Sequence, residues 1–182
     1  MKKYFPLNKK VSINSDNTLF LPDYTFETEI PLSPHPGSFG FIRKNHIHEG
    51  VDLYANDGDP VFAIEDGVVI DILPFTGTIA NSPWWNDTYC VLVAHNSYVI
   101  NYGEITPSMN LSKGSILKGG DIIGNIRTVL LQDKGRPMSM LHLEMYTKGT
   151  IEPIKEWSLN TPKPEQLLDP TSLLLSIYRE KF

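Results

Sequence analysis

The sequence is poor in the features that define several common protein classes. It contains a single cysteine, Cys90, so neither an internal disulfide nor a multi-cysteine zinc finger can form. No run of about 18 apolar residues occurs, and we therefore expect no membrane span. An excess of positive charge is also lacking, because 16 Lys and Arg residues against 21 Asp and Glu residues give a formal net charge of −5. Nucleic acid is therefore not an expected partner.

The composition is that of a globular chain with a real core. Of the 182 residues, 41% are hydrophobic and 20% are charged, which excludes a disordered chain and fits one domain with short appendages. The N-terminus begins with Met1-Lys2-Lys3 like a signal peptide, but Asn8, Lys9 and Lys10 interrupt the apolar region that export would need. We therefore expect no secretory signal.

Turn residues predict an all-β protein. The 14 prolines and 13 glycines separate short apolar runs, which is typical of an antiparallel β-sandwich or barrel. We expect an N-terminal extension over 1–38 with a strand at 18–21, a β domain over 39–150, and a C-terminal tail over 151–182 whose short helix (171–179) packs on the domain. The predicted strands are 61–64 and 68–73 as one hairpin, 89–94 and 98–102 as a second, then 121–126 and 141–146.

The segment from His48 to Asp52 has the character of a metal site. His48, Gly50 and Asp52 alternate, so they share one side of an extended chain. Glycine between the two ligand-type residues leaves room for imidazole and carboxylate to converge on one ion. By itself this pattern is weak evidence.

A second alternating segment, 141–145, strengthens the prediction of a metal site. It places His142 and Glu144 on one face of a strand and three apolar side chains on the other. Two histidines and one aspartate give three protein ligands and leave a fourth tetrahedral position for water, as in catalytic zinc sites. Glu144 would then orient one of the ligands.

Several ordered blocks of the sequence resemble the lysostaphin-like (LytM-type) zinc metallopeptidases. The resemblance extends over about residues 39–147. Its blocks are Phe39-Gly40 through Arg43, His48-x-Gly50-x-Asp52, Gly58-x-Pro60-Val61-x-Ala63, Asp66-Gly67-Val68-Val69, Val91-x-Val93-x-His95, Tyr102-Gly103, Lys118-Gly-Gly-Asp121-x-Ile123-Gly124 and Leu141-His142-Leu143-Glu144.

This resemblance implies a fold, a cofactor and a substrate class. The family folds as a small antiparallel β domain of the duplicated hybrid motif type. Its members cleave peptide bridges of bacterial peptidoglycan, often next to glycine, with Zn²⁺ held by His, Asp and His. Carried over to this chain, the zinc ligands are His48, Asp52 and His142. A cell-envelope location is expected on the same grounds.

The sequence departs from the family pattern at two positions that concern catalysis. The family's Tyr-x-His-Leu segment corresponds to Tyr102-Gly103-Glu104-Ile105, so Glu104 replaces a catalytic histidine. In the family's His-x-His pair, the first and catalytic histidine corresponds to Met140. A thioether cannot donate a hydrogen bond to a developing oxyanion, so Met140 cannot take over that role.

Glu104 admits three interpretations. It acts as general base toward the attacking water, or its carboxylate takes the open zinc position and closes the site, or it is a solvated bystander of an inactive site. The first interpretation predicts a zinc-dependent peptidase that acts on peptidoglycan or a similar peptide. The second predicts an inactive zinc-binding module that binds cell-wall peptide or regulates a hydrolase. A phosphoryl carrier is a third class, but it requires a nucleophilic histidine at one of the two altered positions.

Other polar residues are secondary candidates. His95 and Tyr102 are candidates for the cleft, and Tyr102 and Arg136 are candidates to replace the lost oxyanion donors. Each of the three is as easily explained by packing or by a surface position. We expect His35 to be solvated and His46 to lie at the rim.

Overall fold

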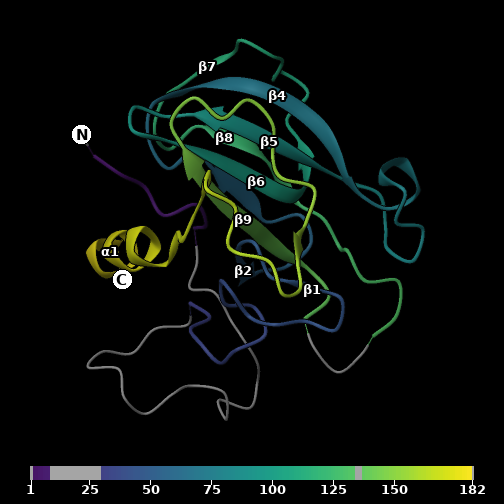
Figure 1. Ribbon diagram of the computed structural model, residues 1–182. Helices are drawn as coiled ribbons and strands as arrows, with labels where there is room; N and C mark the ends of the chain where they lie inside the picture. The colour runs from purple at the N-terminus through teal and green to yellow at the C-terminus, as the bar shows by residue number, and fades with distance from the viewer. Residues whose placement is uncertain (1, 9–29, 134–136, 182) are drawn as a thin grey trace.

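The computed structural model describes residues 2–8, 30–133 and 137–181 (Figure 1). Within these ranges the chain is built almost entirely of strands. The elements are β1 (His46–Ile47), β2 (Val51–Tyr54), β3 (Pro60–Phe62), β4 (Gly67–Thr76), a 3₁₀ turn (Thr78–Ala80), β5 (Thr88–Ala94), β6 (Tyr98–Pro107), β7 (Ile116–Leu117), β8 (Ile122–Ile126), β9 (Met140–Thr147), β10 (Trp157–Ser158), β11 (Leu167–Leu168) and α1 (Thr171–Lys181). The strand predicted at 18–21 lies outside the described residues.

The strands form one large antiparallel sheet and one small one. In the nine-stranded sheet, β11, β9, β6, β5, β4 and β7 follow one another, β2 pairs with β9, and β8 pairs with both β6 and β3. The two-stranded sheet joins β1 to β10. All pairings are antiparallel, which confirms the predicted all-β antiparallel fold. None of the described helices has the length and apolar character of a membrane span.

One of the two predicted hairpins is confirmed and the other is wrong. Strands β5 and β6 pair across the turn that begins at His95, whose N–H donates to the Tyr98 carbonyl at 2.9 Å. In contrast, β3 does not pair with β4: it pairs with β8, while β4 lies between β5 and β7. Asp66, between β3 and β4, accepts a hydrogen bond from the Gly119 N–H at 2.9 Å, which ties this connection to the segment between β7 and β8.

Alternation along β9 separates the core from the polar face of the sheet. Leu141 and Leu143 are fully buried in the main hydrophobic core. Met140, His142 and Glu144 project from the opposite face, as a period of two requires. The strand therefore carries apolar side chains into the core and a row of functional groups into the polar face.

Both ends of the described chain pack onto this core. Phe5 contacts Tyr178 of α1 edge to face, with ring centroids 5.2 Å apart, and Leu7 is also buried. In Figure 1, α1 lies next to the N-terminal segment beside the sheet. The helix begins where predicted, because the Asp169 side chain accepts a hydrogen bond from the Thr171 N–H at 2.8 Å.

Candidate metal centre

The three residues predicted as ligands come together where β2 pairs with β9. Asp52 lies directly opposite His142 in this ladder, and His48 lies in the turn that leads into β2. Gly50 is required at this place, because a Cβ on it would lie 2.6 Å from the Leu143 carbonyl oxygen and 3.0 Å from the His142 ring. The glycine thus allows the turn to approach the ring of His142.

Three potential ligand atoms form a small triangle. His48 Nε2 lies 3.1 Å from Asp52 Oδ1 and 3.2 Å from His142 Nδ1, and Asp52 Oδ1 lies 2.8 Å from His142 Nδ1. Ligand atoms about 2.0–2.1 Å from a tetrahedral zinc ion lie about 3.3 Å from one another, so the spacing suits zinc. All three residues are buried. The donor set and its spacing therefore fit a zinc ion.

In each histidine ring, the nitrogen that points away from the triangle is hydrogen-bonded to another group. The other nitrogen of each ring therefore faces the triangle. His48 Nδ1 lies 2.9 Å from the Ser38 carbonyl oxygen, to which it can only donate. His142 Nε2 lies 3.2 Å from Glu144 Oε1, a carboxylate oxygen that accepts. In the neutral rings, His48 Nε2 and His142 Nδ1 therefore carry the lone pairs that a metal needs.

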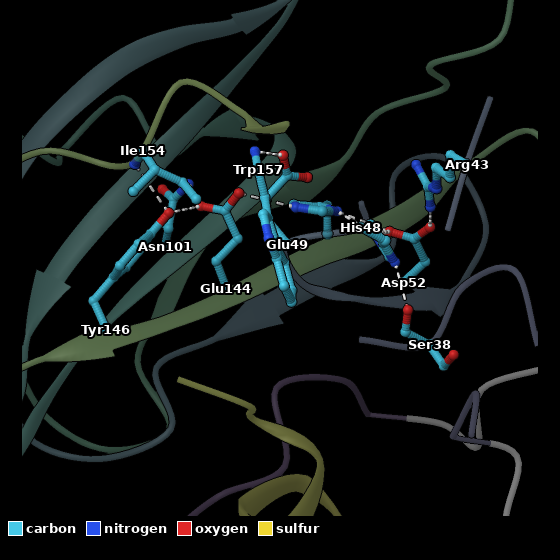
Figure 2. Close-up of polar contacts among 11 residues, drawn as sticks. Ser38, Arg43, His48, Glu49, Asp52, Asn101, Glu144, Tyr146, Ile154 and Trp157 are labelled. Atoms are coloured by element: carbon cyan, nitrogen blue, oxygen red, sulfur yellow. Dashed lines mark hydrogen bonds and ion pairs between the residues drawn. The ribbon is translucent and has the colours of Figure 1, made fainter. Parts of the chain in front are cut away.

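A hydrogen-bond network around Asn101 and Tyr146 holds Glu144 in place, as Figure 2 shows. Asn101 Nδ2 and the Tyr146 hydroxyl donate to Glu144 Oε2 at 2.8 and 2.7 Å, and the Tyr146 oxygen accepts from the Ile154 N–H at 3.2 Å. Burial raises the pKa of Glu144, but the hydrogen bonds from His142, Tyr146 and Asn101 outweigh it and lower the pKa below its ordinary value. Glu144 is therefore a buried carboxylate held ionised.

The Asp52 carboxylate is also held by a hydrogen bond, which it accepts through Oδ2. Arg43 Nη2 donates to Asp52 Oδ2 at 2.7 Å, while Oδ1 faces the two histidines. Burial raises the pKa of Asp52, yet the charges of His48 and Arg43 and the hydrogen bond with His142 hold it well below its usual range. Asp52 is thus a carboxylate shared between a guanidinium and the two rings.

The two histidines differ in their affinity for protons. Burial lowers the pKa of His48 by more than Asp52 raises it. Burial also lowers the pKa of His142, but hydrogen bonds to Asp52 and Glu144 outweigh it and hold this pKa well above 6.5. His142 is therefore the ring for which a proton competes with a metal ion.

Glu104 lies on β6 next to this cluster, in an unusual conformation. Its φ is +64°, a left-handed value that is uncommon for residues other than glycine. The side chain is 8% exposed, and its Oε2 has no hydrogen-bond partner among the described residues. Burial, followed by the charge of Asp52, raises the pKa of Glu104 to about 8. Strain and an unpaired buried oxygen of this kind concentrate at functional sites.

Met140 and Tyr54 flank the cluster on the same face. Met140 lies opposite Tyr54 in the β2–β9 ladder, and the two buried side chains form a small apolar cluster of their own. Phe75 also packs next to the cluster, with its ring centroid 5.5 Å from that of His142. The three potential ligand residues thus have Met140, Tyr54 and Phe75 as neighbours.

The structure does not bring His95 and Tyr102 to this site. Tyr102 lies opposite Leu143 in the β6–β9 ladder and projects into the core, whereas its neighbour Asn101 lies opposite Glu144. The Tyr102 hydroxyl lies 3.1 Å from His95 Nε2 and accepts from the Ile64 N–H at 3.0 Å, so both groups are used internally. Arg136 lies outside the described residues.

Other expectations had mixed outcomes. His35, expected to be solvated, is 4% exposed and its Nδ1 accepts from the Gly37 N–H at 2.9 Å. Cys90 is buried, and burial raises the pKa of its thiol to about 12. Sequence reasoning assigned no role to Ser38, Asn101 or Tyr146, because their contacts depend on strand register.

The family comparison agrees with this geometry. The sequence profile of peptidase family M23 matches residues 46–153, which is more than half of the chain and includes all three residues of the triangle. The chain belongs to peptidase family M23. M23 peptidases are zinc-dependent, act on peptidoglycan peptides and are typically found in the cell envelope or outside the cell.

Solved structures share the M23 fold of this chain at low sequence identity. LytU has a TM-score of 0.54 at 19% identity, over 86% of this chain and 91% of its own. CbpA from L. salivarius REN has a TM-score of 0.51 at 21% identity, over 79% and 87%. The antimicrobial peptidase lysostaphin from Staphylococcus simulans has a TM-score of 0.50 at 22% identity, over 80% of this chain and 50% of its own. A search of curated proteins finds no match.

Proposed function

We propose that this M23 protein is a zinc-dependent peptidase that cleaves peptide bonds of peptidoglycan or of a similar peptide. The observation that carries the proposal is the triangle formed by His48 Nε2, Asp52 Oδ1 and His142 Nδ1, with edges of 2.8–3.2 Å. These residues would hold the ion through two imidazoles and one carboxylate. Three protein ligands leave a coordination position for water or substrate, as catalytic sites require.

The surrounding residues prepare the ligands for this role. Zinc bound by His48, Asp52 and His142 would act as a Lewis acid, which polarises the scissile carbonyl and makes water a better nucleophile. Glu144 accepts the outer proton of His142, and the Ser38 carbonyl accepts that of His48, so both rings keep their orientation and tautomer. Arg43 restrains the Asp52 carboxylate, which leaves Oδ1 aimed at the histidines.

We infer that Glu104 and Met140 stand where the family has its catalytic histidines, and that Glu104 is the general base. Its carboxylate takes the proton from the attacking water and passes it to the leaving amine. The left-handed backbone, the burial and the unpaired Oε2 support this role. Met140 offers no donor to the developing oxyanion, so turnover is expected to be lower than with histidine at this position.

The same unpaired oxygen supports a second candidate function. If Glu104 Oε2 takes the fourth coordination position, the site is closed and the protein is a zinc-stabilised module that binds cell-wall peptide or regulates a hydrolase. The two functions require the same three ligands and differ in whether water can reach the ion. They are separated by substitution of Glu104.

The first experiment measures metal content and peptidoglycan cleavage together. The purified protein, before and after zinc supplementation, is analysed for stoichiometric metal and then incubated with peptidoglycan, whose soluble products are identified by mass spectrometry. His142→Ala is expected to lose zinc and cleavage, whereas His46→Ala, a matched histidine on β1 outside the triangle, is expected to keep both. A protein that binds no metal under either condition would refute the proposal.

We further propose a cell-envelope location and one M23 domain that includes both ends of the described chain. Buried Phe5 and Leu7 share the main core with Leu174, Ile177 and Tyr178 of α1. The described parts of the extension (2–8 and 30–38) and of the tail (151–181) would then be parts of the domain that support the site, and their removal should destabilise it.

A further inference from the structure

A cavity of about 400 Å³ lies beside the triangle of potential ligand atoms, and the charge of its lining differs from the net charge of the protein. Its lining consists of Pro36, Phe41, Ile42, Arg43, Lys44 and Tyr54. Two of these side chains are cationic and none is acidic, although the chain as a whole carries a formal charge of −5. The cavity therefore places two cationic side chains next to the metal centre, and Arg43 is the one that is paired with Asp52.

Arg43 is held in place while part of its guanidinium stays available. Both of its hydrogen bonds to described residues use Nη2, which donates to Asp52 Oδ2 at 2.7 Å and to the Pro36 carbonyl at 3.2 Å. Its Nε and Nη1 have no hydrogen-bond partner among the described residues, and the side chain is 30% exposed. A guanidinium fixed in this way presents a rigid fork of donors, which matches a carboxylate.

The rest of the lining fits an organic anion better than a bare ion. Lys44 is exposed and forms no ion pair with the described residues, so its charge is available to a ligand. Phe41, Ile42 and Pro36 offer apolar surface to an aliphatic group. A small inorganic anion would leave this apolar surface uncovered, whereas a carboxylate at the end of a peptide or amino-acid side chain would cover it.

We propose that this cavity binds a carboxylate group of the peptide substrate, with Arg43 and Lys44 as its partners. The inference rests on the proposed function and names a feature of the substrate. Asp52 faces the two histidines with Oδ1 and Arg43 with Oδ2, so one carboxylate separates the cavity from the metal centre. The recognised group therefore lies within a few residues of the scissile bond, either at the peptide's C-terminus or on a side chain.

The test compares peptides that differ in one charged group. The probes are acetyl-Ala-Gly-Gly-Ala with a free C-terminus, the same peptide as its C-terminal amide, and acetyl-Glu-Gly-Gly-Ala amide, which carries its carboxylate on a side chain. Binding to the purified protein is measured by calorimetry in the cold at low salt, and mass spectrometry verifies that the peptides are intact. We expect one of the two charged peptides to bind about tenfold more tightly than the neutral amide, since hydrogen bonds to charged groups are worth about that much.

Variants assign the preference to the cavity. Lys44→Gln should remove most of the preference for the charged peptide, because it deletes a cavity cation without touching Asp52. Lys148→Gln, an equal change of charge beyond the opposite end of β9 from Met140, should leave the preference intact. Equal binding of charged and neutral peptides, no binding of any of them, or a preference that survives Lys44→Gln would each overturn the inference.

Failure of this inference can be told apart from failure of the proposed function. A protein that holds zinc and cleaves peptidoglycan but binds all three peptides equally keeps its function and lacks the carboxylate site. A protein that holds no zinc but still prefers the charged peptide has the carboxylate site and lacks the proposed activity.

Discussion

Replacement of Glu104 by glutamine probes the most unusual residue of the site. In the metal-free protein, burial and the charge of Asp52 raise the pKa of Glu104 from 4.5 to about 8. Because the folded pKa lies above the unfolded one, the folded state holds this proton more tightly, and the free energy of unfolding falls as pH rises between these values. At pH 7 the folded protein keeps Glu104 protonated while the unfolded chain ionises it, which lowers the free energy of unfolding by about 3 kcal/mol, at about 1.4 kcal/mol per pKa unit between 4.5 and 7. Glutamine keeps the shape of the side chain and carries no charge.

We therefore expect Glu104→Gln to stabilise the metal-free protein at neutral pH and to flatten its pH dependence. The measurement is urea unfolding in the presence of a chelator from about pH 5 to about pH 8. Glu152→Gln, which changes an exposed glutamate, is the matched control and should change neither quantity. A zinc ion beside Glu104 favours its ionised form, so the stabilisation should shrink when zinc is present.

The same variant separates the two candidate functions. If Glu104 is the base, Glu104→Gln keeps zinc affinity and lowers cleavage by about 10²–10⁴-fold. If Glu104 is a fourth ligand, the variant binds zinc more weakly and opens a position for water. Zinc affinity is measured by competition with a chromophoric chelator, and cleavage is measured by release of peptidoglycan fragments. Unchanged zinc affinity, cleavage and metal-free stability would together refute both roles and leave Glu104 a bystander.

Three further predictions concern the ligands and their neighbours. Zinc affinity should fall about tenfold for each pH unit below the raised pKa of His142, because the metal must displace a proton there. Calorimetry in buffers of different ionisation enthalpy should detect the released proton. A pH-independent affinity would contradict this assignment. Glu144→Gln should weaken zinc binding about 10–100-fold, since the ring of His142 loses its carboxylate partner; unchanged affinity would show that this hydrogen bond does not support the site. Met140→His should raise kcat by about 10²–10³ if it restores an oxyanion donor, and equal or lower turnover in a folded, zinc-loaded variant would count against that inference.

The parts of the site that depend on local spacing were predictable from the sequence. His48 and Asp52 lie four residues apart with Gly50 between them, and His142 and Glu144 alternate with core leucines, so period and composition were enough to group them. The structure brings these side chains together as expected. The all-β antiparallel class followed from the turn residues, and the strand pairings confirm it.

The parts that depend on strand pairing were not predictable. The 61–64 segment looked like the partner of 68–73, but β3 instead pairs with β8, which is distant in sequence. The sequence makes Tyr102 a candidate for the cleft, yet its register opposite Leu143 directs it into the core, while the adjacent Asn101 reaches Glu144. A shift of one residue exchanges the two faces of a strand, and strand register cannot be read directly from a single sequence.

Because the ligands lie far apart along the chain, the affinity for the metal ion depends on whether the protein is folded. His48 and Asp52 belong to one short segment, and an unfolded chain can offer both to a passing ion. His142 lies 90 residues beyond Asp52 and joins them when β2 and β9 are paired. Full affinity thus exists in the native protein alone, and each bound ion draws the folding equilibrium toward the native state by mass action. Chelation should accordingly lower the melting temperature, and a change that opens the ladder between β2 and β9 should release the ion even where every ligand is retained.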